Sequence, residues 1–421
     1  MKINHLVKTF AWVAAAFAFA ACNDAEYEPM GGEDGKTVVY FSDASAARGT
    51  VLIMRDVATN KNVTVRLNAP TNHDVKVKIG VDATLLDEYN ERFGTDYVTL
   101  SSEYYTFNQE TVIPAGDVVS APIVLTVNPF VAENGATYAL PLIIKECTGA
   151  QIAERPSQYV YELLKEIGEQ PAASFQGWYA GTGLGENPGD NTEWGIDLDA
   201  FTLEWWINQS AFSVNNQAIF TSGAGPSRGT NTELYVRFGD TNHNNAGANR
   251  YAYLQIKCQG SDANFETADP AEDPLQTNTW YHFAITYTAG DGKYTLYQNG
   301  VKINESTGTA GQMFYFDRFW ICKLSDADHG YRPTTNYTRM CQVRMWKTAR
   351  TEQQIQNYMY VEPRYNDPNL IFFLPMNEGN GAEKFIDVTG HGYDGVIGNM
   401  EASTYPRFPM QWSTINLTSE K

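Results

Sequence analysis

The alternation of apolar and polar residues over positions 293–304 predicts a β-hairpin. The stretch KYTLYQNGVKI, residues 293–303, contains two alternating runs on either side of Asn299-Gly300. An Asn-Gly pair between such runs favours a type I′ turn, because both central residues of that turn have positive φ. Pairing the runs predicts a packed face with Tyr294, Leu296, Val301 and Ile303. The solvated face would carry Thr295, Tyr297, Lys302 and Asn304.

The run before this hairpin predicts a strand that is buried on both faces. In NTWYHFAITYTAGDG, residues 278–292, one face carries Trp280, His282, Ala284 and Thr286. The other face carries Tyr281, Phe283, Ile285 and Tyr287. A strand that is apolar on both sides belongs inside a sandwich of two packed sheets.

The first half of the chain also predicts short strands, and one helix interrupts them. From Val38 onward, short apolar or alternating runs are bounded by turn residues, as in VVYF, VKVKIGV and SAPIVLTV. Residues 83–94 break this pattern, because apolar residues recur at helical spacing before Gly94. We predict a small β-sandwich with one inserted helix over residues 37–167 and a linker over residues 168–174. Residues 158–168 fit a last strand or a short helix equally well.

The N-terminal residues have the pattern of a targeting segment. Lys2 and Lys8 precede an apolar run that ends at Ala21 and is too short to span a membrane. We predict a signal peptide over residues 1–21. The sequence FAAC at its end resembles a bacterial lipobox, which implies cleavage before Cys22 and lipidation of that residue. The alternative is an ordinary signal peptide followed by a stray cysteine.

The acidic, glycine-rich residues 22–36 predict a flexible tether. Their acidic patch resembles the surface-export signal of Bacteroidetes-type lipoproteins. That resemblance implies a lipid-anchored protein of the outer membrane that faces the cell exterior.

Composition and charge limit the fold classes and the kinds of binding partner that we expect for this chain. Aromatic residues make up 13% of the 421 residues, which suits strands better than helix bundles. The formal net charge is −19, and such a chain repels phosphate backbones, so we expect no nucleic-acid partner. Four cysteines follow Cys22, without metal-ligand spacing. Cys322 and Cys341 could pair with each other, and buried free thiols are the alternative.

Two groups of motifs resemble known domains. The runs VYF, NERFGTDYVTL, TVIPAG and YALPLII resemble a domain of unknown function that follows the lipid anchor of Bacteroidetes surface lipoproteins. The order WYHFAITYTAGDGKYTLYQNGVKI closely resembles the laminin-G or concanavalin A-like module. FTLEWWINQ and CQVRMWKTARTEQQIQNYM resemble an early and a late strand of that module. Met376-Asn377 depart from its usual pattern. The resemblance implies a jelly-roll β-sandwich over residues 175–421 and an all-β protein overall.

Sugar recognition needs flat apolar surfaces beside planar polar side chains, and this composition recurs in three segments. The first is residues 175–194, the second is residues 324–339, and the third is residues 237–253. The candidate ligand-binding residues are Trp178, Tyr179, Trp194, Asp240, Arg250, Tyr251, His329, Tyr331, Arg332, Asn336 and Tyr337. The alternative is that the aromatic residues of these loops cover the edges of the core.

Candidate catalytic patterns are weak. GPSRG, residues 225–229, matches G-x-S-x-G, but a strand-like run follows it where a nucleophile elbow needs a helix. Laminarinase-like hydrolases share the concanavalin A-like architecture and place acids at alternating positions of one strand. Asp197, Asp199 and Glu204 come nearest to that pattern. Glu204 lies an odd number of residues after Asp199, so a straight strand would put it on the opposite face.

We therefore expect a cell-surface lipoprotein that binds a glycan without cleaving it and requires no cofactor. The expected partners are a polysaccharide or oligosaccharide, the outer membrane through the lipid anchor, and polysaccharide transporter and hydrolase proteins. The module resemblance leaves room for a structural calcium ion, with Asp240, Asp326 and Asp328 as candidate ligands. A divergent glycoside hydrolase and an adhesin for a host protein or glycoprotein are the alternatives.

Overall fold

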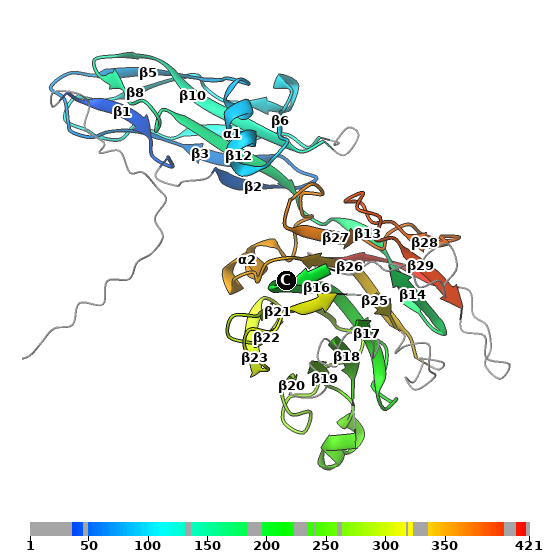
Figure 1. The fold of residues 1–421 in the computed structure, drawn as a ribbon. Helices are drawn as coiled ribbons and strands as arrows, with labels where there is room; N and C mark the ends of the chain where they lie inside the picture. Colours follow the sequence, from blue (N-terminus) through cyan, green and yellow to red (C-terminus); the bar gives the residue numbers. More distant parts are fainter. Residues whose placement is uncertain are drawn as a thin grey trace, which may run out of the picture.

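The computed structural model describes residues 36–44, 49–130, 136–182, 196–222, 234–239, 241–258, 263–316, 319–322, 336–399 and 410–417. Sheets built from β1–β12 and sheets built from β13–β30 exchange no strands within these residues. Figure 1 shows the first set, in blue to cyan, beside the end of the second set that carries β13 and β27. The predicted all-β architecture with two sandwiches is confirmed.

The N-terminal sandwich packs a mixed sheet, in the order β2-β12-β10-β5-β8, against two three-stranded sheets, β11-β1-β4 and β3-β9-β7. Its core is aliphatic and aromatic, with Val39, Val65, Leu125 and Leu140 fully buried. The elements are β1 Val38–Phe41, β2 Thr50–Met54, β3 Thr59–Val63, β4 Val65–Leu67, β5 Val75–Val81, α1 Leu85–Phe93, β6 Val98–Thr99, β7 Tyr105–Thr106, β8 Glu110–Ile113, β9 Ile123–Val127, β10 Tyr138–Thr148, β11 Gln151–Ile152 and β12 Gln158–Lys165.

The predicted helix is confirmed as α1, which ends at Gly94 with φ of 60°. A buried carboxylate holds the helix against the sheet. Tyr89 and Tyr97 donate their hydroxyls to the two oxygens of Glu162, at 2.5 and 2.8 Å. Leu86 packs beside them against Ala139 and Val160.

The C-terminal domain is a sandwich of two large sheets around one core. We call β23-β22-β21-β16-β26-β13-β30, with β27 paired to β26, the first sheet. We call β20-β19-β18-β17-β25-β14-β29-β28 the second sheet. The elements are β13 Glu169–Phe175, β14 Trp178–Thr182, β15 Ile196–Leu198, β16 Ala200–Gln209, β17 Gln217–Ser222, β18 Leu234–Phe238, β19 Leu254–Cys258, β20 Ala263–Glu266, β21 Trp280–Thr288, β22 Lys293–Gln298, β23 Val301–Thr307, β24 Phe314–Phe316, β25 Phe319–Ile321, β26 Thr338–Trp346, α2 Glu352–Tyr358, β27 Leu370–Leu374, β28 Lys384–Phe385, β29 Gly395–Asn399 and β30 Gln411–Asn416.

The hairpin formed by β22 and β23 confirms the predicted turn but not the predicted faces. Asn299 and Gly300 have φ of 50° and 79°, as the turn requires. A bulge shifts the register, so that Leu296 pairs with Asn304 while Tyr297 pairs with Lys302. One extra residue in a strand moves the following side chains to the other face. Ile303 is the extra residue of this bulge and is 40% exposed. Val301 lies before the bulge, beside the turn, and is 53% exposed, whereas Thr295 and Tyr297, expected on the solvated face, are buried.

The expected linker is wrong for most of its length. Residues 169–175 form β13, which pairs with β26 on one side and β30 on the other. Residues 158–165, where strand and helix were both open, form strand β12. The described cysteines form no disulfide with one another, and Cys258, Cys322 and Cys341 are buried. Burial raises the pKa of the Cys322 and Cys341 thiols well above the ordinary range, so neither forms a thiolate at neutral pH.

The short connection between the domains is paired with the segment after α2. The Ile167 N–H donates to the Tyr360 carbonyl at 2.8 Å, and the Glu362 N–H donates to the Lys165 carbonyl at 3.0 Å. Glu166 and Val361 form a β-bridge between these two bonds. Arg364 adds a side-chain contact across the junction, with its guanidinium 5.3 Å from the centre of the Tyr97 ring. In the described part of the chain, no helix is both long and apolar enough to span a membrane.

Candidate functional site

Six of the eleven predicted ligand-binding residues can be placed. Trp178, Tyr179, Arg250, Tyr251, Asn336 and Tyr337 belong to the described residues. Trp194, Asp240, His329, Tyr331 and Arg332 lie outside them, as do Cys22 and the candidate calcium ligands Asp326 and Asp328.

Asn336 belongs to the framework, contrary to our prediction. Its side chain is 3% exposed, and its amide donates to the Ala211 carbonyl at 2.8 Å. It also lies 3.4 Å from Gln217 Oε1, in a buried network that joins the two sheets. Gln209 donates to Gln217 at 3.0 Å, Gln217 donates to Thr338 at 2.7 Å, and Thr338 donates back to Gln209 at 2.6 Å. We call this network the amide ring. Gln209, Gln217 and Thr338 satisfy one another, which is why these polar groups can be buried, while Asn336 Oδ1 is buried without a donor among the described residues.

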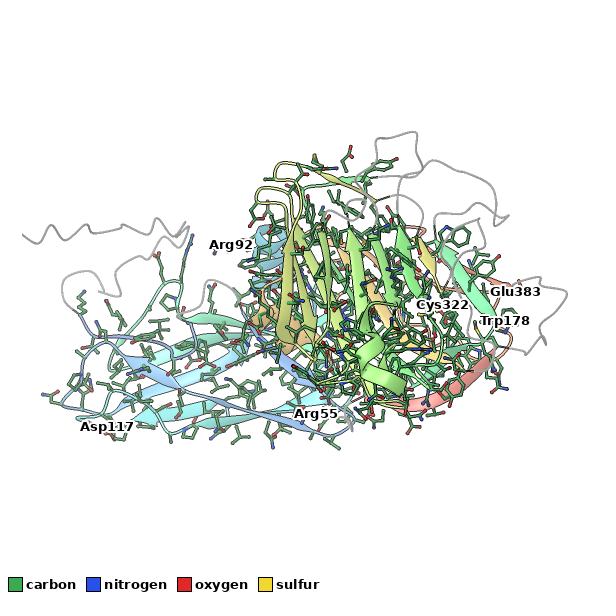
Figure 2. All side chains as sticks on the ribbon, turned by 90° about the horizontal axis from the view of Figure 1, so that it is seen from below. Arg55, Arg92, Asp117, Trp178, Cys322 and Glu383 are labelled. Carbon is green, nitrogen blue, oxygen red and sulfur yellow. The ribbon has the colours of Figure 1, made fainter. Side chains whose placement is uncertain are left out.

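Trp178 and Tyr179 lie on β14 with different surroundings. Trp178 packs against the core cluster, which agrees with the alternative of an edge-covering aromatic residue. Figure 2 shows Trp178 and Cys322 on the same side of the C-terminal domain. Tyr179 is half-buried and its ring lies over Gly398, where an added Cβ would come within 2.2 Å of it. Its ring centre is 5.8 Å from that of Trp320, in an edge-to-face arrangement.

A polar and aromatic group sits on the outer face of the second sheet. Val236 and Phe238 point into the core, so Tyr235 and Arg237 of the same strand lie on the other face, where Tyr235 is buried and Arg237 is half-buried. Arg237 Nη1 donates to Asn216 Oδ1 at 2.7 Å, and its Nε donates to Gln255 Oε1 at 2.6 Å. The guanidinium lies 5.1 Å from the centre of the Tyr235 ring. The Tyr235 hydroxyl also donates to Asn216, at 2.6 Å.

Gly239 connects this group to the predicted residues Arg250 and Tyr251. The Asn216 N–H donates to the Gly239 carbonyl at 2.9 Å. Tyr251 packs on the other side of Gly239, where an added Cβ would lie 2.7 Å from the Tyr251 Cβ. Arg250 is exposed and stacks 4.7 Å from the centre of the half-buried Tyr251 ring. We call Asn216, Tyr235, Arg237, Arg250, Tyr251 and Gln255 the rim cluster.

The topology explains why distant segments meet at this end of the second sheet. Phe238, at the end of β18, pairs with Gln217, and Ile321, at the end of β25, pairs with Phe220 and Ala180. The segment after β18, which carries Arg250, therefore starts at the same end of the sheet as the segment after β25. Asn216, Tyr235 and Gln255 were missed by the sequence analysis, although their planar side chains were the type sought. Tyr235 and Gln255 lie on strands rather than loops, so only the strand register identifies their outward face.

The three acids considered for catalysis do not form a site. Asp197 lies on β15 and is exposed, as is Asp199. Glu204 lies on β16 and is fully buried on the outer face of the first sheet. A pair of glycosidase carboxylates must flank one sugar bond, and these residues do not.

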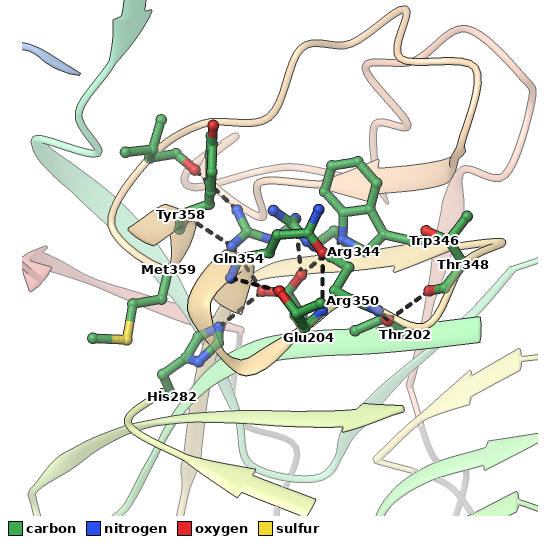
Figure 3. Close-up of polar contacts among 12 residues, drawn as sticks. Thr202, Glu204, His282, Arg344, Trp346, Thr348, Arg350, Gln354, Tyr358 and Met359 are labelled. Carbon is green, nitrogen blue, oxygen red and sulfur yellow. Dashed lines mark hydrogen bonds and ion pairs between the residues drawn. The ribbon is translucent and has the colours of Figure 1, made fainter. Parts of the chain in front are cut away.

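Both oxygens of Glu204 have framework partners, as Figure 3 shows. Oε2 is 3.0 Å from Arg344 Nη2, while Oε1 accepts from Trp346 Nε1 at 2.8 Å and lies 3.2 Å from Arg350 Nη1. Arg344 also donates to the backbone carbonyls of Tyr358 and Val361, at 3.0 and 2.9 Å. Burial opposes the charged carboxylate, but Arg344 and Arg350 outweigh it and hold the pKa of Glu204 well below its usual range.

His282, the histidine of the laminin-G-like motif, completes this buried group. Its Nε2 lies 3.4 Å from Glu204 Oε2, and its ring packs 5.3 Å from that of Trp206. Burial lowers the pKa of His282 despite the nearby carboxylate, so the imidazole is neutral at pH 7. The described residues contain no group of three or more His, Cys, Asp or Glu side chains arranged to hold a metal ion.

Comparisons with known proteins agree with the two domains. A family model of an N-terminal domain matches residues 34–151. The model of the concanavalin A-like lectin/glucanases superfamily matches residues 189–356. The C-terminal sandwich is therefore a concanavalin A-like domain, as the resemblance implied.

Several solved structures are similar to the chain. A candidate carbohydrate binding protein from Bacteroides ovatus is 22% identical, with a TM-score of 0.46, and the match covers 87% of this chain and 98% of that one. A heptameric SAP-like pentraxin from Limulus polyphemus is 14% identical, with a TM-score of 0.33, and the match covers 44% and 80%. A Bacteroides ovatus protein of unknown function is 15% identical, with a TM-score of 0.31, and the match covers 77% and 100%. No curated protein matches the chain.

Proposed function

We propose that this protein binds a glycan at the rim cluster and does not cleave it. The observation that carries the proposal is the joining of an exposed arginine–tyrosine stack to planar polar side chains on the face of a concanavalin A-like domain. Arg250 and Tyr251 supply the stack, and the half-buried Asn216 and Arg237 supply the planar groups, with Arg237 held by the buried Gln255.

The chemistry of these groups suits a sugar. The ring of Tyr251 offers a flat apolar surface to the C–H face of a pyranose. Amide and guanidinium groups offer donors and acceptors at fixed spacing, which can engage neighbouring hydroxyls together. The mutual hydrogen bonds of Asn216, Arg237 and Gln255 hold these side chains in place, which lowers the entropy lost on binding.

The placement of the acids supports binding without cleavage. Glu204 is the one buried member of the candidate acid set, and its oxygens are held by Arg344, Trp346 and Arg350. It therefore has neither access to a glycosidic bond nor the raised pKa of a general acid.

The proposed setting follows from the targeting segment and the composition. A lipid on Cys22 would anchor the chain in the outer membrane, and the N-terminal sandwich would hold the glycan-binding domain away from the bilayer. The captured polysaccharide would then be passed to transporter and hydrolase proteins at the same surface.

Binding to a panel of polysaccharides tests the proposal. Affinity electrophoresis and calorimetry of the whole mature chain should identify at least one ligand, and no reducing sugar should appear over time. Arg250→Ala and Tyr251→Ala should each weaken that binding about tenfold or more, the scale of one lost stacking contact.

Arg92→Ala is the matched control. Arg92 is also exposed and stacks on the next residue, with its guanidinium 5.3 Å from the Phe93 ring centre, but it lies in the N-terminal domain. It should leave binding unchanged. Steady release of reducing sugar would establish a hydrolase instead, and equal binding by all three variants would remove the rim cluster as the site.

A further inference from the structure

A second polar and aromatic group lies on the outer face of the first sheet, centred on Arg339. Ile207 and Met340 belong to the core, so their strand neighbours Asn208 and Arg339 point to the other face. Asn208 pairs in register with both Trp280 and Arg339. We call Asn208, Asn278, Trp280, Tyr337 and Arg339 the Arg339 site.

The guanidinium of Arg339 is held between two aromatic rings. Its Cζ lies 5.9 Å from the centre of the Trp280 ring and 5.3 Å from that of Tyr337. Its Nη2 donates to Asn208 Oδ1 at 2.7 Å and lies 3.4 Å from Asn278 Oδ1. Cation–π contacts and amide acceptors orient a guanidinium without neutralising its charge. Arg339 thus remains a cation in a fixed position, half-buried in the surface.

Arg339 has no carboxylate partner among the residues that the structure describes. Other buried arginines contact a carboxylate directly. Arg344 and Arg350 contact Glu204, and Arg364 contacts Asp367. In addition, Arg339 Nε is buried without an acceptor in this part of the chain. Buried donors without acceptors are rare and costly. Arg344 and Arg364 also have a guanidinium nitrogen that is buried without an acceptor, but each contacts a carboxylate as well, which Arg339 does not do among the described residues.

The Arg339 site and the rim cluster flank the same end of the domain. Gln217 and Asn336 are neighbours in the amide ring. Asn216 of the rim cluster precedes Gln217, and Tyr337 of the Arg339 site follows Asn336. Each cluster thus contains a residue next to the amide ring, and a glycan long enough to contact both would pass around this end of the domain.

We propose that the Arg339 site binds the carboxylate of an acidic sugar residue, a uronate, within the glycan held by the rim cluster. This inference rests on the proposed function. Arginine is the side chain best suited to a carboxylate, because its planar donors match the two oxygens. The exposed amide of Asn278 and the ring of Tyr337 lie beside it, so the amide can bond sugar hydroxyls and the ring can contact a sugar face.

The experiment compares polygalacturonate with its fully methyl-esterified form, which has the same sugar rings without the charge. Affinities of the mature chain are measured at about 0.15 M salt, where the Debye length of about 8 Å screens the acidic surface. The wild type should prefer the acid form about tenfold or more, the scale of one charge-assisted hydrogen bond. Arg339→Gln should bring this ratio to about one, while its binding of the ester is retained.

Two further variants make the result decisive. Arg250→Gln removes the same charge at the rim cluster, so it should weaken both forms and leave their ratio unchanged. Arg339→Lys keeps the charge but loses the planar donors, so it should lower the ratio partly. Thermal unfolding shows whether Arg339→Gln is folded. If it is not, the affinity ratio of Arg339→Lys decides the test.

Each other outcome overturns the inference. Equal wild-type affinity for the two forms would overturn it. An acid preference that is undiminished in the Arg339 variants, or that is lost in Arg250→Gln alone, would also overturn it. Binding of neutral glycans only would overturn the inference while leaving the proposed function standing. Failure to bind any glycan on the panel would overturn the proposed function itself.

Discussion

Glu204 illustrates how strongly the surroundings of one carboxylate decide what it does. The residue sits on a strand of a fold that also carries hydrolases. With Asp197 and Asp199 it came nearest to their acid pattern, although its odd spacing from Asp199 argued against a shared face. Two guanidinium groups, one indole N–H and full burial make it a framework ion instead. An ion pair of this kind is costly to break because the remaining charges stay buried.

We therefore predict that Glu204→Gln destabilises the protein by about 3–5 kcal/mol, since it leaves Arg344 and Arg350 without a counter-charge. The measurement is urea unfolding of the whole chain followed by tryptophan fluorescence. Glu305→Gln is the control, because Glu305 pairs with Lys293 and Lys302 at the surface. A loss for Glu204→Gln no larger than that of the control would contradict the framework role.

His282 makes the free energy of unfolding of the C-terminal domain depend on pH. Its pKa in the folded state is lowered by burial, below the value of about 6.5 expected for the unfolded chain. The unfolded state therefore takes up the proton first, and the free energy of unfolding falls as the pH drops below about 6.5. Glu204, whose pKa is also lowered, adds a further loss in more acidic solution, because folding then competes with its protonation.

We expect His282→Gln to lose less stability than the wild type between about pH 7.5 and 5.5, since it has no imidazole to protonate. Denaturant unfolding at a series of pH values checks this. Parallel curves for variant and wild type would show that His282 does not carry the effect.

At the scale of elements, the turn after β18 shapes the rim cluster. Gly239 has φ of +63° and faces Tyr251, so a side chain there meets both backbone strain and a clash. Gly247, in the same connection, also has a positive φ of +57°, but open space surrounds the position of its Cβ. A side chain at either glycine would strain the backbone, but only a side chain at Gly239 would also clash with Tyr251.

Gly239→Ala should displace Tyr251 and weaken glycan binding, in addition to a strain cost of about 1–3 kcal/mol. Gly247→Ala should pay a similar strain cost and bind as the wild type does. Calorimetry with the ligand found on the panel, together with thermal unfolding, tests both. Equal binding by the two variants would mean that Tyr251 does not contact the ligand.

At the scale of the whole molecule, the Glu204 group connects to the domain junction. Arg344 donates to the Val361 carbonyl, and Val361 forms a bridge with Glu166 in the connection between the domains. The segment that holds this connection is therefore itself held by the core of the C-terminal domain. We infer that the two domains move as one body and that the N-terminal domain serves as a rigid spacer.

Spin labels at Asp117→Cys and Glu383→Cys test this, because Figure 2 shows these residues at opposite ends of the molecule. With the half-buried Cys147 replaced by serine, we expect a narrow distance distribution. Insertion of a short Gly-Ser segment after Gly168 should broaden it, since such linkers behave as flexible coils. The same insertion after Gly311, in an open turn of the C-terminal domain away from both labels, is the control. A broad distribution without any insertion would contradict the rigid junction.

The extent to which the sequence predicted this protein differs between fold and site. Alternation, the Asn-Gly pair and the helical spacing around Leu86 are local signals, and they identified strands, a turn and α1 correctly. The faces of β23 were wrong because a bulge has no clear local signal. The linker was wrong because Pro171 and small residues lowered its apparent strand character, while β26 and β30 supply the pairing that makes it β13.

A residue can bind a ligand only if its side chain is accessible to solvent, and the composition of a segment does not show which side chains are accessible. Arg250 and Tyr251 were expected at a ligand site, and their surroundings support that proposal. Asn336 had the same favourable composition, yet Gln217 and Ala211 use its side chain in the interior. Asn216, Tyr235 and Gln255 come together through strand register and through one turn, although they are far apart along the chain.

The sequence by itself determined the all-β class and the concanavalin A-like domain, because these depend on periodic burial and on short motifs that neighbouring residues encode. Only the tertiary structure decided which polar residues face solvent and which satisfy one another inside. Glu204, Asn336 and Arg339 are all polar residues on or beside strands, but pairing across the sheets buries the first two and leaves the third as a cation at the surface. The physical reason is that the energy of a polar group depends on its partners, and those partners come from distant parts of the chain.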